Sequence, residues 1–181
     1  MLLATFRIAL AEPDAVTPSN ATPETAPAAA SASLSASGSS AVHWAGERTQ
    51  DLLATALSSI GVKYKRGAND PAVGFDCSGF VQHVYRSALG LLLPHNAYSM
   101  SLQGRSVGLD ELIPGDLVFF HTLKHQFSHV GIYLGENRFI HAPSKGKTVQ
   151  VDKLDDAYWT KHFTGARRLD TEVAATPPRA E

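Results

Sequence analysis

The chain has 181 residues, with 16 Lys and Arg against 17 Asp and Glu, and a formal net charge of −1. This balance gives no electrostatic reason to expect a nucleic-acid or anionic-membrane partner, and no stretch approaches the roughly 18 apolar residues of a membrane span. A single cysteine excludes an intrachain disulfide, so a packed core must provide the stability, and the length predicts one domain with some tail sequence.

The two ends of the chain differ in composition from its middle. Residues 1–11 resemble a shortened export signal, although Arg7 interrupts the apolar run, and a plain disordered start is the alternative. Residues 12–41 are rich in Ala, Ser, Thr and Pro and contain no aromatic residue, so we expect a disordered linker. Residues 171–181 are predicted to be a disordered tail for the same reason. The predicted domain therefore spans residues 42–170.

Helical patterns dominate the first half of this domain. Apolar residues recur at spacings of three and four over residues 52–60 and are followed by Gly61, which predicts an amphipathic helix with a glycine stop. Asp76 precedes a second periodic run that closes at Gly90, so Asp76 is the expected N-cap of a second helix. A shorter helix is expected over residues 97–103.

After Pro114 and Gly115 the pattern changes to short β-rich runs separated by glycine and polar residues. The tight connection at residues 136–137 predicts an antiparallel hairpin between the second and third of these runs. Helices followed by an antiparallel sheet predict an α+β fold. The candidate strands cover residues 116–121, 129–134, 138–142, 148–151 and 166–169.

The single cysteine, Cys77, lies in the first turn of the helix that Asp76 is expected to cap. Free N–H groups and the helix dipole favour an anion there, so we expect a lowered thiol pKa and a nucleophilic thiolate. The small neighbours Ser78 and Gly79 would let a substrate carbonyl approach, and the amide of Cys77 could donate to an oxyanion. A lone cysteine is more often a core residue, but Cys77 lies ahead of the apolar stripe. The pattern favours an acyl-transfer site.

A thiolate mechanism needs an imidazole base and a third group that orients it. His129 begins one predicted strand and His141 ends the next, so the hairpin brings them together, although the register does not decide which ring contacts sulfur. Either histidine alone would be explained as an ordinary strand residue bonded to backbone carbonyls. His83 is on the same helix as Cys77 and points away from it. The other histidines outside the strands are expected at the surface: His43, His95 and His162.

A metal site is the competing hypothesis for some of these histidines. His121, His125 and His129 recur every four residues, and a helix would present them on one face as metal ligands. The flanking β-rich runs and the lack of nearby acidic partners favour strands joined by a loop. We therefore expect no metal and no cofactor, with His121 and His125 near the cleft.

The motifs, in their order and spacing, resemble the NlpC/P60 cell-wall cysteine peptidases. The resemblance covers residues 52–169, and the ordered set is more specific than any single motif. It implies a papain-like α+β fold in which the cysteine at a helix start packs on a small antiparallel sheet. The matching segments are residues 61–67, 74–81, 93–95, 114–120, 128–133 and 139–142.

The resemblance also implies a role for each site residue. It makes Cys77 the nucleophile, His129 the base and His141 the third member of the triad. Tyr64 matches a tyrosine near the oxyanion position, and two residues match positions that help to bind the amino end of the substrate in some members: Asp76 and Ser78.

The implied substrate is the peptide part of peptidoglycan, cut next to D-glutamate or diaminopimelate. That substrate implies a location in the cell envelope, and we expect a monomer because no long apolar seam remains. An acyltransferase or amidase with the same triad, and a non-catalytic wall-binding module, are the alternatives. Lys63, Arg66 and Ala68 depart from the usual family residues and make the subsite beside Tyr64 more basic.

Overall fold

The computed structural model describes residues 36–122 and 125–169, with side chains described from residue 46 onward. The expected export signal at residues 1–11 and the expected tail at residues 171–181 lie outside the described residues. Among those that are described, no helix is both long enough and apolar enough to cross a membrane.

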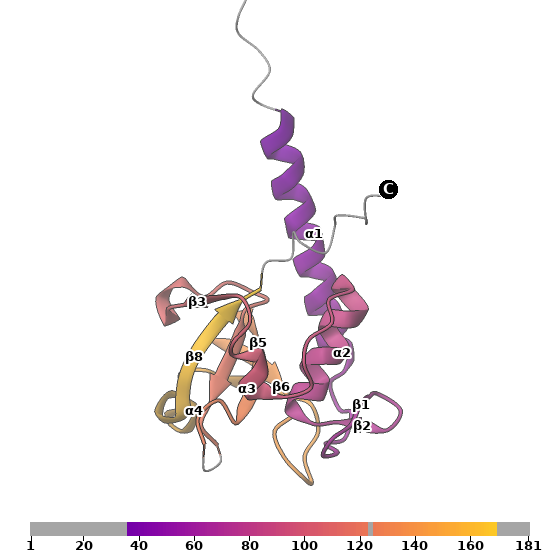
Figure 1. Ribbon diagram of the computed structural model, residues 1–181, viewed down its shortest axis with the longest axis vertical. Helices are drawn as coiled ribbons and strands as arrows, with labels where there is room; N and C mark the ends of the chain where they lie inside the picture. Colours follow the sequence, from indigo (N-terminus) through magenta and orange to yellow (C-terminus); the bar gives the residue numbers. More distant parts are fainter. Residues whose placement is uncertain (1–35, 123–124, 170–181) are drawn as a thin grey trace, which may run out of the picture. The chain divides into compact units, whose positions relative to one another are not determined.

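The first helix, α1, begins at Ala36, inside the segment 12–41 that composition had assigned to a linker. Alanine is the strongest helix former, so an Ala- and Ser-rich segment can extend an adjoining amphipathic helix without aromatic residues. Figure 1 shows α1 beside α2, the helix that starts at Cys77. Gly90 ends α2 in a left-handed conformation with φ of 68°, as a glycine stop requires. The helical segments are α1 (Ala36–Ser58), α2 (Cys77–Leu89), α3 (Ala97–Met100), the 3₁₀ turn η1 (Leu109–Glu111) and α4 (Ala157–His162).

The sheet has six antiparallel strands in the order β3-β8-β4-β5-β6-β7. Figure 1 labels four of them, β3, β8, β5 and β6. A separate two-stranded ribbon, β1-β2, lies just before α2 in the chain. The sequence pattern located the last five strands to within a few residues but did not identify β1, β2, β3 or α4. The strands are β1 (Asn69–Asp70), β2 (Gly74–Phe75), β3 (Arg105–Val107), β4 (Leu117–Phe120), β5 (His129–Gly135), β6 (Arg138–His141), β7 (Gln150–Lys153) and β8 (Phe163–Arg168).

The predicted hairpin joins β5 to β6. Glu136 and Asn137 form its turn, with φ values of 51° and 57° in the left-handed region. The strands pair in antiparallel register, with Ile132 opposite Ile140. Because the turn lies between His129 and His141, this pairing places the two histidines near the same end of the sheet.

The sheet carries apolar packing on both faces. Along β4, Leu117 and Phe119 belong to the cluster shared with α1 and α2, whereas Val118 and Phe120 belong to the cluster that contains Trp159 of α4. This alternation follows from the period of two in a β-strand. The sheet therefore holds α2 on one face and α4 on the other, and both contribute to the site at its edge.

Candidate active site

Asp76 fixes the start of α2, where Cys77 is the first helical residue. The N–H of Gly79 donates to Asp76 Oδ1 at 2.7 Å, which is the N-cap bond expected from the sequence. The hydroxyl of Ser78 also donates to Oδ1, at 3.1 Å, and the N–H of Gly67 donates to Oδ2 at 2.7 Å. One carboxylate thus ties the cysteine turn to the preceding loop.

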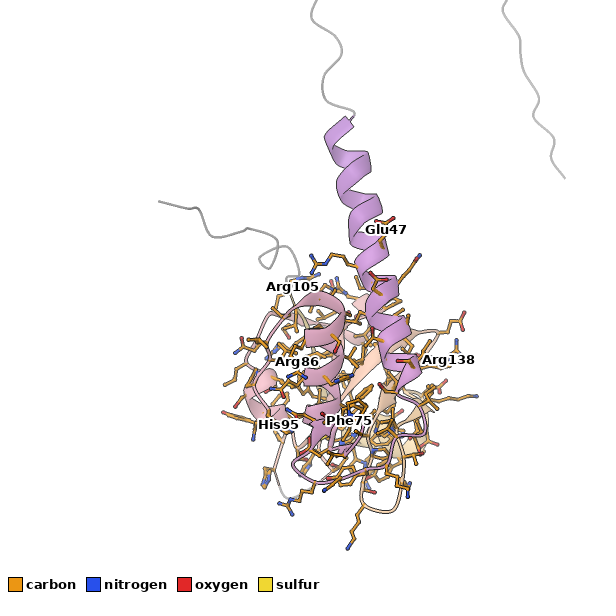
Figure 2. All side chains as sticks on the ribbon, turned by 90° about the vertical axis from the view of Figure 1, so that its right-hand side faces the viewer. Glu47, Phe75, Arg86, His95, Arg105 and Arg138 are labelled. Atoms are coloured by element: carbon orange, nitrogen blue, oxygen red, sulfur yellow. The ribbon has the colours of Figure 1, made fainter. Side chains whose placement is uncertain are left out.

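His95 joins this group, although the sequence pattern gave it no partner. Its Nε2 lies 3.1 Å from Asp76 Oδ1. Figure 2 labels His95 and also Phe75, the residue just before Asp76. A contact between residues 76 and 95 depends on how the loop after α2 folds back, and no local pattern reports it. The only available signal was its place in the family-like segment 93–95.

The predicted histidine pair is in direct contact. His129 Nε2 lies 2.7 Å from His141 Nδ1, and both side chains are buried. His141 Nε2 lies 3.0 Å from Asp152 Oδ2 on the neighbouring strand β7. The three side chains therefore form a continuous hydrogen-bonded line, which we call the relay: His129, His141 and Asp152.

Asp152 was not identified from the sequence, yet the structure surrounds it with donors. Trp159 Nε1 donates to Oδ2 at 3.1 Å, and Gln150 Nε2 donates to Oδ1 at 2.9 Å. Gln150 and Asp152 share one face of β7 because they are two residues apart. Two polar residues on one face of a predicted strand were the available signal for Asp152. That signal could be linked to His141 only once β7 was known to pair with β6.

The carboxylate at the end of the relay sets the direction of its hydrogen bonds. An ionised Asp152 can only accept, so His141 donates from Nε2 and its neutral ring then accepts at Nδ1. His129 must therefore donate from Nε2 to His141. The remaining ring nitrogen, Nδ1 of His129, is left with a free lone pair and can accept a proton.

Cys77 and His129 line the same cavity, whose volume is about 440 Å³. Tyr64 and Lys147 lie on its wall, and Tyr158 and Trp159 contribute from α4. A volume of this order matches the clefts that hold small ligands or a few residues of a peptide.

His121 and His125 are exposed residues of the connection between β4 and β5, so they do not share a helix with His129. Within residues 36–122 and 125–169, no group of three or more His, Cys, Asp or Glu side chains could hold a metal ion. The helical three-histidine arrangement is therefore not the one the chain adopts.

Known proteins share this sequence pattern and this fold. A family model described as the NlpC/P60 family matches residues 61–168. The chain belongs to the NlpC/P60 family. Both the family and the papain-like α+β fold predicted from the sequence are confirmed.

Two curated relatives of this NlpC/P60 chain are named as hydrolases. The gamma-DL-glutamyl hydrolase of Bacillus subtilis is 45% identical over 112 residues, which are 61% of this chain and 27% of that protein. The murein DD-endopeptidase MepS/murein LD-carboxypeptidase of Escherichia coli is 41% identical over 109 residues, which are 60% of this chain and 56% of that protein. The matched part is thus little more than half of one relative and about a quarter of the other.

A solved structure shows the same fold. The crystal structure of an NlpC/P60 family protein from Bacillus cereus superposes with a TM-score of 0.62 at 32% identity. The match covers 66% of this chain and 39% of that one.

The electrostatics of the cysteine differ from the expectation. Burial raises the pKa of the Cys77 thiol to about 11, and the negative charge of Asp76 acts in the same direction. Backbone hydrogen bonds from Val130, Ser78 and Cys77 itself lower this pKa, but their effect is smaller than that of burial. The predicted lowering of the thiol pKa is therefore wrong for the resting site, because desolvation outweighs the helix start.

The histidines of the relay are neutral in the resting site as well. Burial lowers the pKa of His129 to about 3, and the charge of His141 contributes in the same direction. Burial also lowers the pKa of His141, opposed by its hydrogen bond to Asp152 and by that carboxylate's charge. The hydrogen bond from His141 in turn lowers the pKa of Asp152. At neutral pH Cys77 is thus a thiol, the two imidazoles of the relay are neutral and Asp152 is a carboxylate.

A neutral thiol should be visible in its alkylation kinetics. We expect the rate of Cys77 modification by iodoacetamide to rise steadily from about pH 6 to about pH 10, because only the thiolate reacts. Intact-mass spectrometry measures this at one site, since the chain has a single cysteine. The denatured chain is the control and should titrate near about 8.5. A reactive plateau already present below about pH 7 would contradict a protonated resting thiol.

Proposed function

We propose that this protein is a cysteine endopeptidase that hydrolyses peptide bonds in peptidoglycan. One observation carries the proposal: Cys77, at a helix start, shares a cavity with His129. Nε2 of His129 contacts His141, and His141 in turn contacts Asp152. A nucleophile, a base and an orienting group are the parts that covalent acyl transfer needs. The names of the two relatives, a glutamyl hydrolase and a murein endopeptidase, support this substrate class.

The proposed first step is attack of Cys77 Sγ on the substrate carbonyl. Because the resting thiol is protonated, Nδ1 of His129 takes its proton as the carbon–sulfur bond forms. Backbone hydrogen bonds of Val130, Ser78 and Cys77 lower the pKa of the thiol, so they favour the loss of its proton in this step.

Two donors are proposed for the oxyanion of the tetrahedral intermediate. The N–H of Cys77 is one, since the first N–H groups of a helix have no partner within the helix. The phenol of Tyr64 is the other, because it lines the cavity and stays protonated at neutral pH. Burial raises the pKa of Tyr64, with the charges of Cys77 and Asp76 adding to the effect and Arg66 opposing it.

The relay is proposed to stabilise the imidazolium that forms on His129. His141 accepts the hydrogen bond from Nε2 of His129, and Asp152 supplies the negative charge at the far end. His129 then gives its proton to the leaving amine as the carbon–nitrogen bond breaks, which leaves an acyl-enzyme on Cys77. Water, deprotonated by His129, attacks the thioester and releases a carboxylate and the thiol.

We also propose that Asp76 binds the amino end of the substrate. Its Oδ2 accepts only the N–H of Gly67 in the described part of the chain, so it has capacity for an ammonium group. Ser78 is buried and donates to Oδ1, so its proposed contribution is to hold the carboxylate in place.

Peptidoglycan lies outside the cytoplasmic membrane, and this substrate would place the protein in the cell envelope.

Product analysis in water enriched in heavy oxygen tests the proposal. The full chain is incubated with defined stem peptides, and we expect fragments whose new carboxylate carries one heavy oxygen, because water resolves the acyl-enzyme. Mass spectrometry then also identifies the bond. Fragments joined to an added amine would favour an acyltransferase. Binding of the peptides without any cleavage would favour a wall-binding module.

A further inference from the structure

Two loops beside the cavity concentrate positive charge. Residues 61–67 and 143–149 contain no acidic residue. The chain as a whole is nearly neutral, so this is a local excess. We call the five cations of these loops the basic rim, and all five side chains are exposed: Lys63, Lys65, Arg66, Lys145 and Lys147.

Backbone hydrogen bonds hold the two loops together. The N–H of Tyr64 donates to the carbonyl of Lys147 at 2.9 Å, and the N–H of Val149 donates to the carbonyl of Val62 at 2.8 Å. The first loop is also tied to the residue pair before Cys77, because the N–H of Phe75 donates to the carbonyl of Lys63 at 3.1 Å. The backbone that carries the cations therefore has a fixed position relative to the start of α2.

The basic rim reaches the reacting groups. Lys147 lines the same cavity as Cys77 and His129, and its charge acts on the ring of His141. On the other loop, the charge of Arg66 acts on the phenol of Tyr64. An anion bound by Lys147 would therefore lie in the same cavity as the nucleophile.

None of the five rim cations forms an ion pair within the described residues. The two carboxylates of the site keep their charge but accept hydrogen bonds from other groups. Asp76 accepts from Gly67 and Gly79, and Asp152 accepts from His141 and Trp159. Five unpaired like charges repel one another, and an anionic ligand relieves that repulsion.

We propose that the basic rim binds the free carboxylates of an acidic peptide next to the scissile bond, with Lys147 contacting the carboxylate nearest the reacting carbonyl. This inference rests on the proposed function, since peptidoglycan stem peptides carry such carboxylates at D-glutamate and diaminopimelate. A peptide whose carboxylate is amidated keeps its shape but loses the charge. The rim therefore makes the amidation state of the substrate a determinant of specificity.

The test compares two stem peptides that differ only in whether the carboxylate beside the cleaved bond is free or amidated. We expect Lys147→Gln to reduce the ratio of kcat/KM on the acidic peptide to kcat/KM on the amidated peptide about three- to fivefold. A combined Lys63→Gln, Lys65→Gln and Lys147→Gln chain should reduce this ratio about tenfold or more. Lys153→Gln is the matched control, because this exposed lysine lies at the far end of β7, opposite Arg138.

Salt gives a second readout that a merely structural effect would not produce. The wild-type preference for the acidic peptide should shrink as ionic strength rises from about 0.01 M to about 0.15 M, because the screening length falls from about 30 Å to about 8 Å. The proposal is overturned if the wild type cleaves both peptides equally well, or if Lys147→Gln slows both to the same extent.

Failure of the proposed function would be recognised separately. If the wild type cleaves neither peptide, calorimetric titration of the Cys77→Ala chain with the same two peptides tests whether the basic rim binds the carboxylate. Tighter binding of the acidic peptide, lost on adding Lys147→Gln, supports carboxylate recognition without catalysis. Equal affinities for the two peptides overturn it.

Discussion

Cys77→Ala is expected to lower kcat/KM for peptide hydrolysis by at least about 10⁴-fold, because every covalent step of the proposed mechanism passes through Sγ. The fold should persist, because the substitution removes only the Sγ atom and alanine is compatible with the first turn of α2. Peptide cleavage followed by mass spectrometry gives the rate, and circular dichroism gives the melting temperature. Undiminished hydrolysis by a folded Cys77→Ala protein would exclude the mechanism.

Cys77→Ser is the informative companion to that variant. The hydroxyl is close in size to the thiol, but its pKa is far higher, and His129 is a weak base in its buried position. We therefore expect Cys77→Ser to be nearly as inactive as Cys77→Ala. Recovery of substantial activity by serine would mean that His129 is a much stronger base than its burial indicates.

His129→Gln is expected to lower kcat about 10³- to 10⁴-fold with little change in KM, because it removes the proton acceptor. Glutamine can still donate to Nδ1 of His141, so the rest of the relay should keep its arrangement. Steady-state kinetics on a defined stem peptide measures both parameters. A comparable rise in KM would instead indicate that His129 positions the substrate.

The same relay predicts a graded series. His141→Gln should cost about 10- to 100-fold in kcat, and Asp152→Asn less, because each step lies further from the transferred proton. The charge of Asp152 raises the pKa of both histidines, so Asp152→Asn should also move the acidic limb of the pH–rate profile to lower pH. An unchanged pH profile combined with a lower melting temperature would show that Asp152 serves only the packing of β7.

The local sequence was sufficient for much of the fold because its signals are short-range. The apolar spacing of α2, the cap at Asp76 and the stop at Gly90 depend on residues within a few positions of one another. The hairpin turn at residues 136–137 is equally local, and it was enough to predict that His129 and His141 are neighbours. The helix α4 was missed because its six residues are too few to show a period.

Other properties of the site were decided only by tertiary structure. Asp152 completes the relay because β7 pairs with β6, and His95 reaches Asp76 because the loop after α2 folds back. Helix geometry correctly located Cys77 at a helix start, but its thiol pKa follows from how deeply the sheet and the loops enclose it. Helix starts and turns arise from nearby residues, whereas desolvation, strand pairing and the clustering of the basic rim depend on segments that meet only when the chain has folded.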